Sequence, residues 1–236
     1  MRTVTNTKLI QRNSKIGQYT TLGSLGLMVV AMIISYRMQN EPAYWLGALL
    51  VGFFLFQIGT YFTNRWGRNP RPNEVIDKSL KGLGRDFIAY HYVTPVSHLL
   101  VSPAGVWAIL PYYLNGVVSY DKKRWRLKGG GVIQGYLRLF GQDTIGRPDL
   151  EAEAAIDSAQ RYFKKVLPEG TEIPTIQTLL LFANPKVELN VEGAPMPALK
   201  AKDLKDFMRG KGKEKQLGES LLNRIQQALP QTTDEE

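Results

Sequence analysis

The chain has 236 residues and a formal net charge of +9, and it contains no cysteine. This length suits one medium-sized domain with an accessory segment, and the lack of cysteine excludes disulfides, thiolate metal sites and cysteine nucleophiles. Seven of the nine net charges lie in residues 1–19 and 64–71, which contain no acidic residue, so the high pI alone is weak evidence for nucleic-acid binding.

Two uncharged apolar stretches, residues 21–36 and 44–62, follow a basic N-terminus at residues 1–20. Each approaches the roughly 20 residues that a membrane-spanning helix needs. Because only residues 37–43 separate them, we expect an antiparallel transmembrane helical hairpin over residues 21–63. A cleaved signal peptide is disfavoured, since no small-x-small site follows the first stretch and a second stretch does. The length of the uncharged stretches disfavours a buried helical pair of a soluble protein.

Basic residues on both flanks predict the orientation of this hairpin. The basic N-terminus and a basic linker at residues 64–71 flank it, whereas the short connection balances Arg37 with Glu41. Because Lys and Arg are retained on the cytoplasmic side, we expect a multi-pass protein of the cell membrane with both termini cytoplasmic. Within the hairpin, four glycines are expected to let the helices approach closely: Gly23, Gly26, Gly47 and Gly52.

The rest of the chain alternates β-rich segments with amphipathic helices. A long helix that begins at Pro148 separates two groups of strands, which predicts an α/β layered domain. Helices are expected at residues 72–83, 148–167, 202–209 and 216–229, and strands at residues 86–94, 98–102, 106–110, 117–120, 175–183 and 187–191.

Residues 98–116, HLLVSPAGVWAILPYYLNG, combine an apolar strand, an S-x-x-G turn, a second apolar strand and a glycine turn. This pattern resembles the nuclease-related domain (NERD) family, whose motif is an Asp-His step, an apolar strand, S-x-x-G, and an apolar strand ending in Glu-x-Lys. The resemblance implies a PD-(D/E)xK, restriction-endonuclease-like mixed-sheet fold over residues 72–210, in a family often attached to membrane helices. Residues 211–236 are then a linker, a C-terminal amphipathic helix and a tail.

The residues that carry chemistry in that family are replaced in this chain. In the fold, two carboxylates bind Mg²⁺ and the lysine positions or activates the attacking water. Ser97 stands at the Asp position, Leu110 at the Glu position and Tyr112 at the Lys position, while Glu74 is a possible acidic remnant. A hydroxyl and an isobutyl group do not replace two hard anionic ligands. The resemblance therefore implies a degenerate site and a pseudo-enzyme without a cofactor, and Mg²⁺ belongs only to the alternative of a rearranged, active site.

A run of cations surrounds one tryptophan between residues 122 and 128. Such a run can contact phosphates while the indole stacks on a base, or it can lie on anionic lipid headgroups. Strand alternation also allows a solvated edge whose indole belongs to the core. The candidate binding residues are Lys122, Lys123, Arg124, Trp125, Arg126 and Lys128.

The two histidines, His91 and His98, are too few for a His-rich metal centre. Ser97 and His98 are adjacent in sequence, so in a strand their side chains point to opposite faces and form no Ser–His pair. We therefore expect His98 to be structural.

Three functions remain open at this point. The first is a membrane-anchored, catalytically inactive NERD-like domain that acts as an interaction or nucleic-acid-associating module on the cytoplasmic face. The second is an active metal-dependent nuclease with a rearranged site. The third is a structural subunit of a membrane complex, in which Gln57 and the hairpin glycines contact a protein partner.

Overall fold

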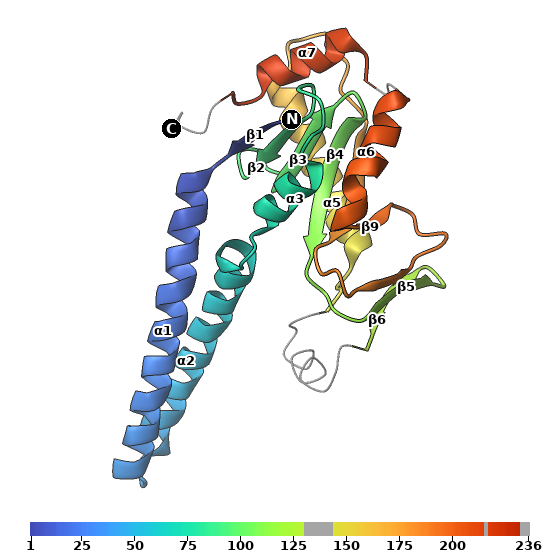
Figure 1. The fold of residues 1–236 in the computed structure, drawn as a ribbon. Coiled ribbons are helices and arrows are strands. Elements are labelled where there is room, and N and C mark those ends of the chain that lie inside the picture. Colours follow the sequence, from blue (N-terminus) through green and yellow to red (C-terminus); the bar gives the residue numbers. More distant parts are fainter. Residues whose placement is uncertain (130–143, 215–216, 232–236) are drawn as a thin grey trace. The chain divides into compact units, whose positions relative to one another are not determined.

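The computed structural model describes residues 1–129, 144–214 and 217–231 (Figure 1). The chain forms two compact units. We call residues 7–72 the helical unit, and residues 1–6 together with 73–236 the α/β unit.

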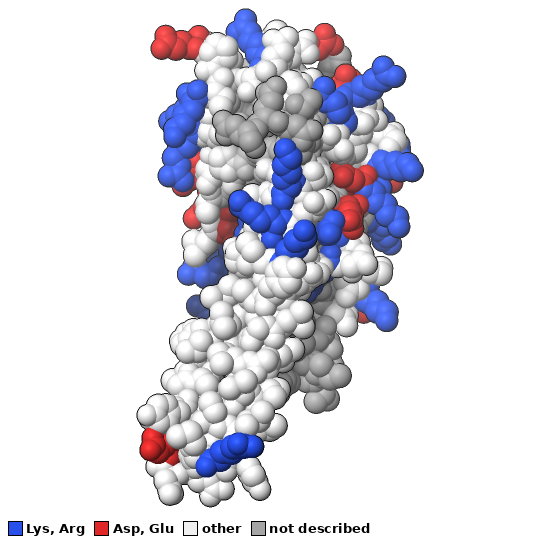
Figure 2. Space-filling view, turned by 90° about the vertical axis from the view of Figure 1, so that its left-hand side faces the viewer, with Lys and Arg blue, Asp and Glu red and all other residues white. Residues whose placement is uncertain are grey.

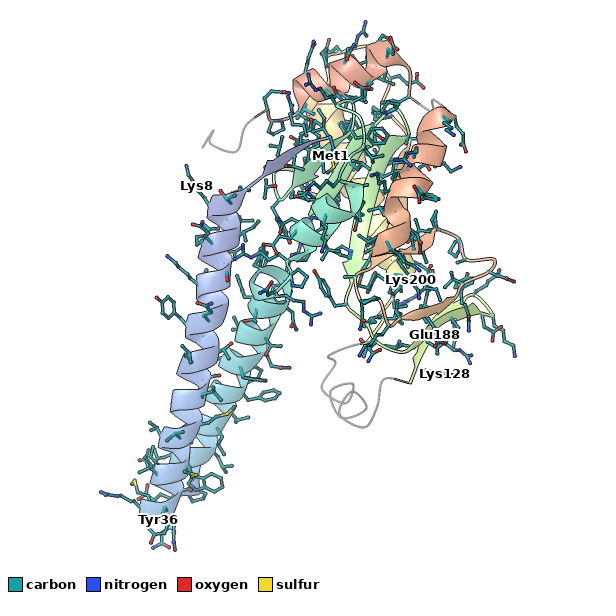
Figure 3. All side chains as sticks on the ribbon, in the orientation of Figure 1. Met1, Lys8, Tyr36, Lys128, Glu188 and Lys200 are labelled. Atoms are coloured by element: carbon teal, nitrogen blue, oxygen red, sulfur yellow. The ribbon has the colours of Figure 1, made fainter. Side chains whose placement is uncertain are left out.

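The helical unit is a pair of antiparallel helices. Helix α1 spans Thr7–Arg37, and α2 spans Pro42–Phe62 and continues into a π-helical turn, η1, at Thr63–Gly67. Pro42 occupies the first turn of α2, where a missing N–H costs nothing. Both helices are long and apolar enough to cross a membrane. In Figure 3, Lys8 and Tyr36 mark the two ends of α1.

The bounds of the hairpin differ from those predicted. Helix α1 begins at Thr7, because no proline or other helix stop separates the basic segment from the apolar stretch that follows it. The apolar stretch thus marks only part of the helix. The predicted linker at residues 64–71 is also partly helical, since η1 continues to Gly67.

Close packing of the two helices depends on glycines that the sequence did not single out. A Cβ placed on Gly59 would lie 2.8 Å from the backbone nitrogen of Thr21, and one on Gly17 would lie 2.9 Å from that of Thr63. Of the predicted glycines, only Gly52 faces α1. A Cβ on Gly23, Gly26 or Gly47 would meet nothing within 4 Å, because the helical phase turns these residues away from the partner helix.

The α/β unit is built on a six-stranded mixed sheet in the order β1-β2-β3-β4-β7-β9. Strands β2, β3 and β4 form an antiparallel meander, whereas β1 pairs parallel with β2, and β7 pairs parallel with both β4 and β9. The strands span Arg2–Thr5 (β1), Ile88–His91 (β2), His98–Ser102 (β3), Gly105–Tyr112 (β4), Ile176–Phe182 (β7) and Ala198–Lys200 (β9).

Helices cover both faces of this sheet, which gives a layered α/β architecture as predicted. On one face, α3 (Pro72–Leu80) and α6 (Leu204–Lys213) bury side chains such as Ile76 and Met208 against Trp107. On the other face, α5 (Pro148–Val166) and α7 (Glu219–Ala228) bury Phe163 and Ile225 against the opposite side of the strands. A 3-10 turn at Ala201–Asp203 precedes α6. Helix α7 therefore belongs to the core and is not a peripheral segment.

A small three-stranded sheet, in the order β6-β5-β8, extends the unit (Figure 1). Its strands are β5 (Val117–Asp121), β6 (Arg124–Lys128) and β8 (Glu188–Asn190). The turn between β5 and β6 is Lys122–Lys123, and both residues have positive φ, of 48° and 60°. These are the backbone angles of the tight hairpin turns whose twist matches that of the strands.

Strand β1 changes the predicted organisation of the chain. Residues 1–20 were expected to form a separate N-terminal segment, but Arg2–Thr5 pair with Ile88–His91 of β2. The hairpin is thus inserted between the first strand of the α/β unit and α3. Neither β1 nor β9 was predicted, because four-residue and three-residue parallel strands carry no apolar alternation of their own and form only beside a distant partner.

Candidate functional site

The positions that the nuclease-related motif singles out lie at one end of the central sheet. His91 of β2 pairs with His98 of β3. Leu99 of β3 pairs with Ala108 of β4, so the residues just before β3 and those late in β4 meet at the same end. We define the sheet end as His91, Ser97, His98, Leu110 and Tyr112.

Leu110 and Tyr112 take structural roles there. Leu110 packs against the apolar cluster that joins the two sheets. The Tyr112 ring stacks on Phe182 with centroids 5.6 Å apart, and its hydroxyl donates a hydrogen bond of 2.5 Å to Glu151 Oε2. Burial raises the pKa of Tyr112 far above its ordinary value, and the bond to Glu151 and the charges of Glu151 and Asp149 raise it further. Tyr112 is therefore a neutral donor tied to α5.

Ser97 and Glu74 do not complete a carboxylate pair. Ser97 is half-buried in the turn before β3, where its carbonyl accepts the N–H of Tyr92 at 2.9 Å. Glu74 is exposed in the first turn of α3, a position where the helix dipole favours an acid. Over residues 1–129, 144–214 and 217–231, no three His, Asp or Glu side chains gather as a metal site. The residues at the sheet end thus do not fit Mg²⁺.

The sequence analysis missed a buried hydrogen-bond chain at the sheet end. His91 Nε2 lies 3.0 Å from Asp77 Oδ1 of α3, and His91 Nδ1 lies 2.9 Å from His98 Nδ1. Both imidazoles are about fully buried, with 1% and 2% exposed. With both rings neutral, one assignment satisfies these two contacts: His91 donates to Asp77 through Nε2–H and accepts the Nδ1–H of His98. The chain therefore fixes a single tautomer of each ring.

These hydrogen bonds join α3 to two strands, and the carboxylate of Asp77 is the acceptor at one end. The rings of Tyr92 and His98 pack in a T-shaped arrangement, with centroids 4.8 Å apart, so the second imidazole is enclosed as well. The structural role expected for His98 agrees with these contacts. A signal was present in the sequence: two histidines seven residues apart on either side of a turn become cross-strand partners.

Strand β6 carries exposed cations, in contrast to the sheet end. It is an edge strand, and Arg124, Arg126 and Lys128 are exposed along one side of it, as are the turn residues Lys122 and Lys123. Alternation turns the intervening side chains inward. The strand therefore displays a row of cations about 6.6 Å apart along its axis.

Trp125 belongs to the core of the small sheet. Its side chain is 8% exposed, its ring packs on Tyr120 with centroids 5.1 Å apart, and its Nε1–H donates to Asp149 Oδ1 at 3.0 Å. Of the alternatives open at the sequence level, these contacts favour a core indole, and no base can stack on the ring in this arrangement.

The sheet end and β6 thus present different kinds of side chain to a ligand. The sheet end holds apolar or already bonded side chains, whereas β6 holds exposed cations. Comparison of the chain with protein-family models, curated proteins and solved structures finds no match. The nuclease-related resemblance therefore stays a prediction, and the function is proposed from these residues.

Proposed function

We propose that this protein is a membrane-anchored, catalytically inactive module of nuclease-related ancestry that associates with nucleic acid on the cytoplasmic face. The observation that carries the proposal is that β6 has exposed cations, whereas the sheet end lacks the carboxylates and lysine of a nuclease. Strand β6 holds three exposed cations in a row, which suits a phosphate backbone. The nuclease positions at the sheet end hold Ser97, Leu110 and Tyr112 in place of two carboxylates and a lysine.

The order of elements supports the nuclease-like part of the proposal. After β1, the α/β unit has a short helix, three antiparallel strands, the β5–β6 hairpin, a long helix and a strand parallel to β4. The long helix α5 and the strand β7 occupy the segments that the resemblance assigns to them.

Two features of the hairpin support membrane anchoring. Large apolar side chains are exposed along it, including Val29 at 52%, Leu50 at 60% and Phe54 at 63%, and hydrocarbon is the solvent that suits such a surface. Figure 2 shows most of the length of the hairpin free of charged side chains. The N-terminal strand and the rest of the α/β unit belong together, so both ends of the hairpin emerge on one side, and the basic flanks make that side cytoplasmic.

Charge reversal on β6 tests the nucleic-acid role. In the full chain reconstituted in nanodiscs, Arg124→Glu, Arg126→Glu and Lys128→Glu together should weaken duplex DNA binding at least tenfold. The slope of log affinity against log salt should fall by about 2 to 3, because each phosphate-bound cation contributes about 0.9. A matched control reverses three exposed cations of α5, namely Arg161, Lys164 and Lys165. Equal losses in both variants would refute a site on β6.

The same variants separate nucleic acid from lipid. If DNA binding is unchanged while association with vesicles of anionic phosphatidylglycerol is lost, β6 is a lipid-binding edge and the proposal is wrong.

Catalytic inactivity is tested directly on the full chain. We expect no cleavage of single-stranded or duplex DNA above background with Mg²⁺ or Mn²⁺, because no three His, Asp or Glu side chains gather as a metal site among the residues described. Metal-dependent cleavage that disappears in Glu74→Gln or in Asp77→Asn would show instead that a rearranged active site exists.

A further inference from the structure

A groove lies within the helical unit at the end of the hairpin where α1 begins and α2 ends. It has a volume of about 390 Å³ and is mostly apolar. Its wall is formed by one stripe from α1 and one from α2 and η1: Gln18, Thr21, Leu22, Thr60, Thr63 and Asn64.

Cations stand at one end of this groove. The Arg68 guanidinium donates to Asn64 Oδ1 at 3.4 Å, so it is held beside a residue of the wall. Lys15 lies one helical turn before Gln18 and on the same side of α1. Because Gly17 lies against Thr63, the residues that precede Gln18 and those that follow Asn64 are at the same end of the helix pair.

With α2 across a bilayer, the groove lies at the level where the hydrocarbon core meets the headgroups. Helix α2 has 21 residues and so spans about 31 Å, close to the thickness of a hydrocarbon core of about 30 Å. Thr60 and Leu22 are then level with the first carbons of the acyl chains, next to the glycerol, and the cations of Lys15 and Arg68 are level with the headgroups. The wall also holds an unused polar atom: among the residues described, Thr21 Oγ1 is buried without a hydrogen-bond partner.

We propose that this groove binds one anionic glycerophospholipid. The phosphate lies against Lys15 and Arg68, the glycerol region meets the amides of Gln18 and Asn64, and the upper part of one acyl chain runs past Leu22. Charge complementarity at one end and an apolar wall at the other favour a lipid over a free anion. The inference rests on the proposed insertion of the hairpin in a membrane, and it is independent of nucleic-acid binding by β6.

Native mass spectrometry of the full chain in detergent tests the site. With phosphatidylglycerol and phosphatidylcholine of identical chains supplied together, one phosphatidylglycerol should be retained preferentially. Lys15→Gln with Arg68→Gln should lower its retention at least tenfold. Arg37→Gln, which removes a cation from the opposite end of the hairpin, should leave retention unchanged.

A second variant tests the groove itself. Thr60→Phe fills the groove while keeping both cations, so it should also abolish retention. Retention that survives Thr60→Phe would show surface attraction and would overturn the groove. Displacement of the lipid by millimolar glycerol 3-phosphate would show a phosphate site and would overturn the lipid.

Extraction of membranes at high pH distinguishes failure of this inference from failure of the proposed anchoring. A protein that stays in the membrane but shows no preference for phosphatidylglycerol refutes the lipid site alone. A protein that is released by the treatment refutes the anchoring, and the lipid site with it.

Discussion

Gly59→Leu is expected to force the two helices of the hairpin apart. Any Cβ at this position would lie 2.8 Å from the backbone nitrogen of Thr21, and backbone cannot rotate out of the way as a side-chain tip can. Overpacking of this kind costs about 1 to 3 kcal/mol, and we expect the upper end of that range. Thermal unfolding of the full chain in detergent measures the loss. Because the chain has no cysteine, disulfide cross-linking of two cysteines introduced at positions 28 and 52 reports the distance between the two helices directly.

The hairpin supplies its own control for this substitution. Gly47→Leu places the same side chain on the same helix where nothing lies within 4 Å. It should be neutral or stabilise the helix by up to about 1 kcal/mol, because leucine is a better helix former than glycine. A loss at Gly47 equal to that at Gly59 would contradict packing through Gly59 and would instead point to a partner on the outer face.

His91→Leu is expected to lower the free energy of unfolding of the α/β unit by about 1 to 4 kcal/mol. The substitution leaves the buried N–H of His98 without its acceptor, and an unsatisfied buried group costs about 1 to 3 kcal/mol. The carboxylate of Asp77 also loses its bond, but it is 32% exposed and water solvates it in part. Unfolding by urea, followed through the fluorescence of the buried Trp107 and Trp125, measures the change.

Two further variants separate the hydrogen bond from the charge. Asp77→Asn keeps an oxygen that can accept from His91, so it should cost less than half as much as His91→Leu. Glu74→Ala, on the exposed side of the same helix, should change stability by no more than about 0.5 kcal/mol. If Asp77→Asn lowers the free energy of unfolding as much as His91→Leu does, the contact between Asp77 and His91 is instead an ion pair with a protonated imidazole.

Local pattern was enough to predict most elements of the fold. The strand at His98–Ser102 has the predicted bounds, and α5 ends one residue before its predicted end, because a short continuous apolar run and a proline-led apolar stripe are signals within one segment. Strand β1 gave no such signal. Its pairing with β2 depends on residues more than 80 positions away, and no local pattern encodes that distance.

The proximity of the two motif segments was predictable, but the bonds around them were not. The motif placed Ser97 and Leu110 near each other, and the strand register brings the two segments to one end of the sheet. The bonds that define their surroundings were not foreseeable. Tyr112 finds Glu151 across 39 residues, and His91 finds Asp77 across 14. Such partners depend on where the helices pack on the sheet. The order of residues along one strand does not specify that position.

The insertion of the hairpin between β1 and β2 alters the entropy of folding. Pairing of Arg2 with Ile88 closes a long loop, but a hairpin that has already formed brings its own two ends together and removes about 60 residues from that loop. Since the cost of closure grows with the logarithm of loop length, the shortcut is worth about 1 kcal/mol. Assembly of the helices first is therefore expected to make completion of the sheet easier.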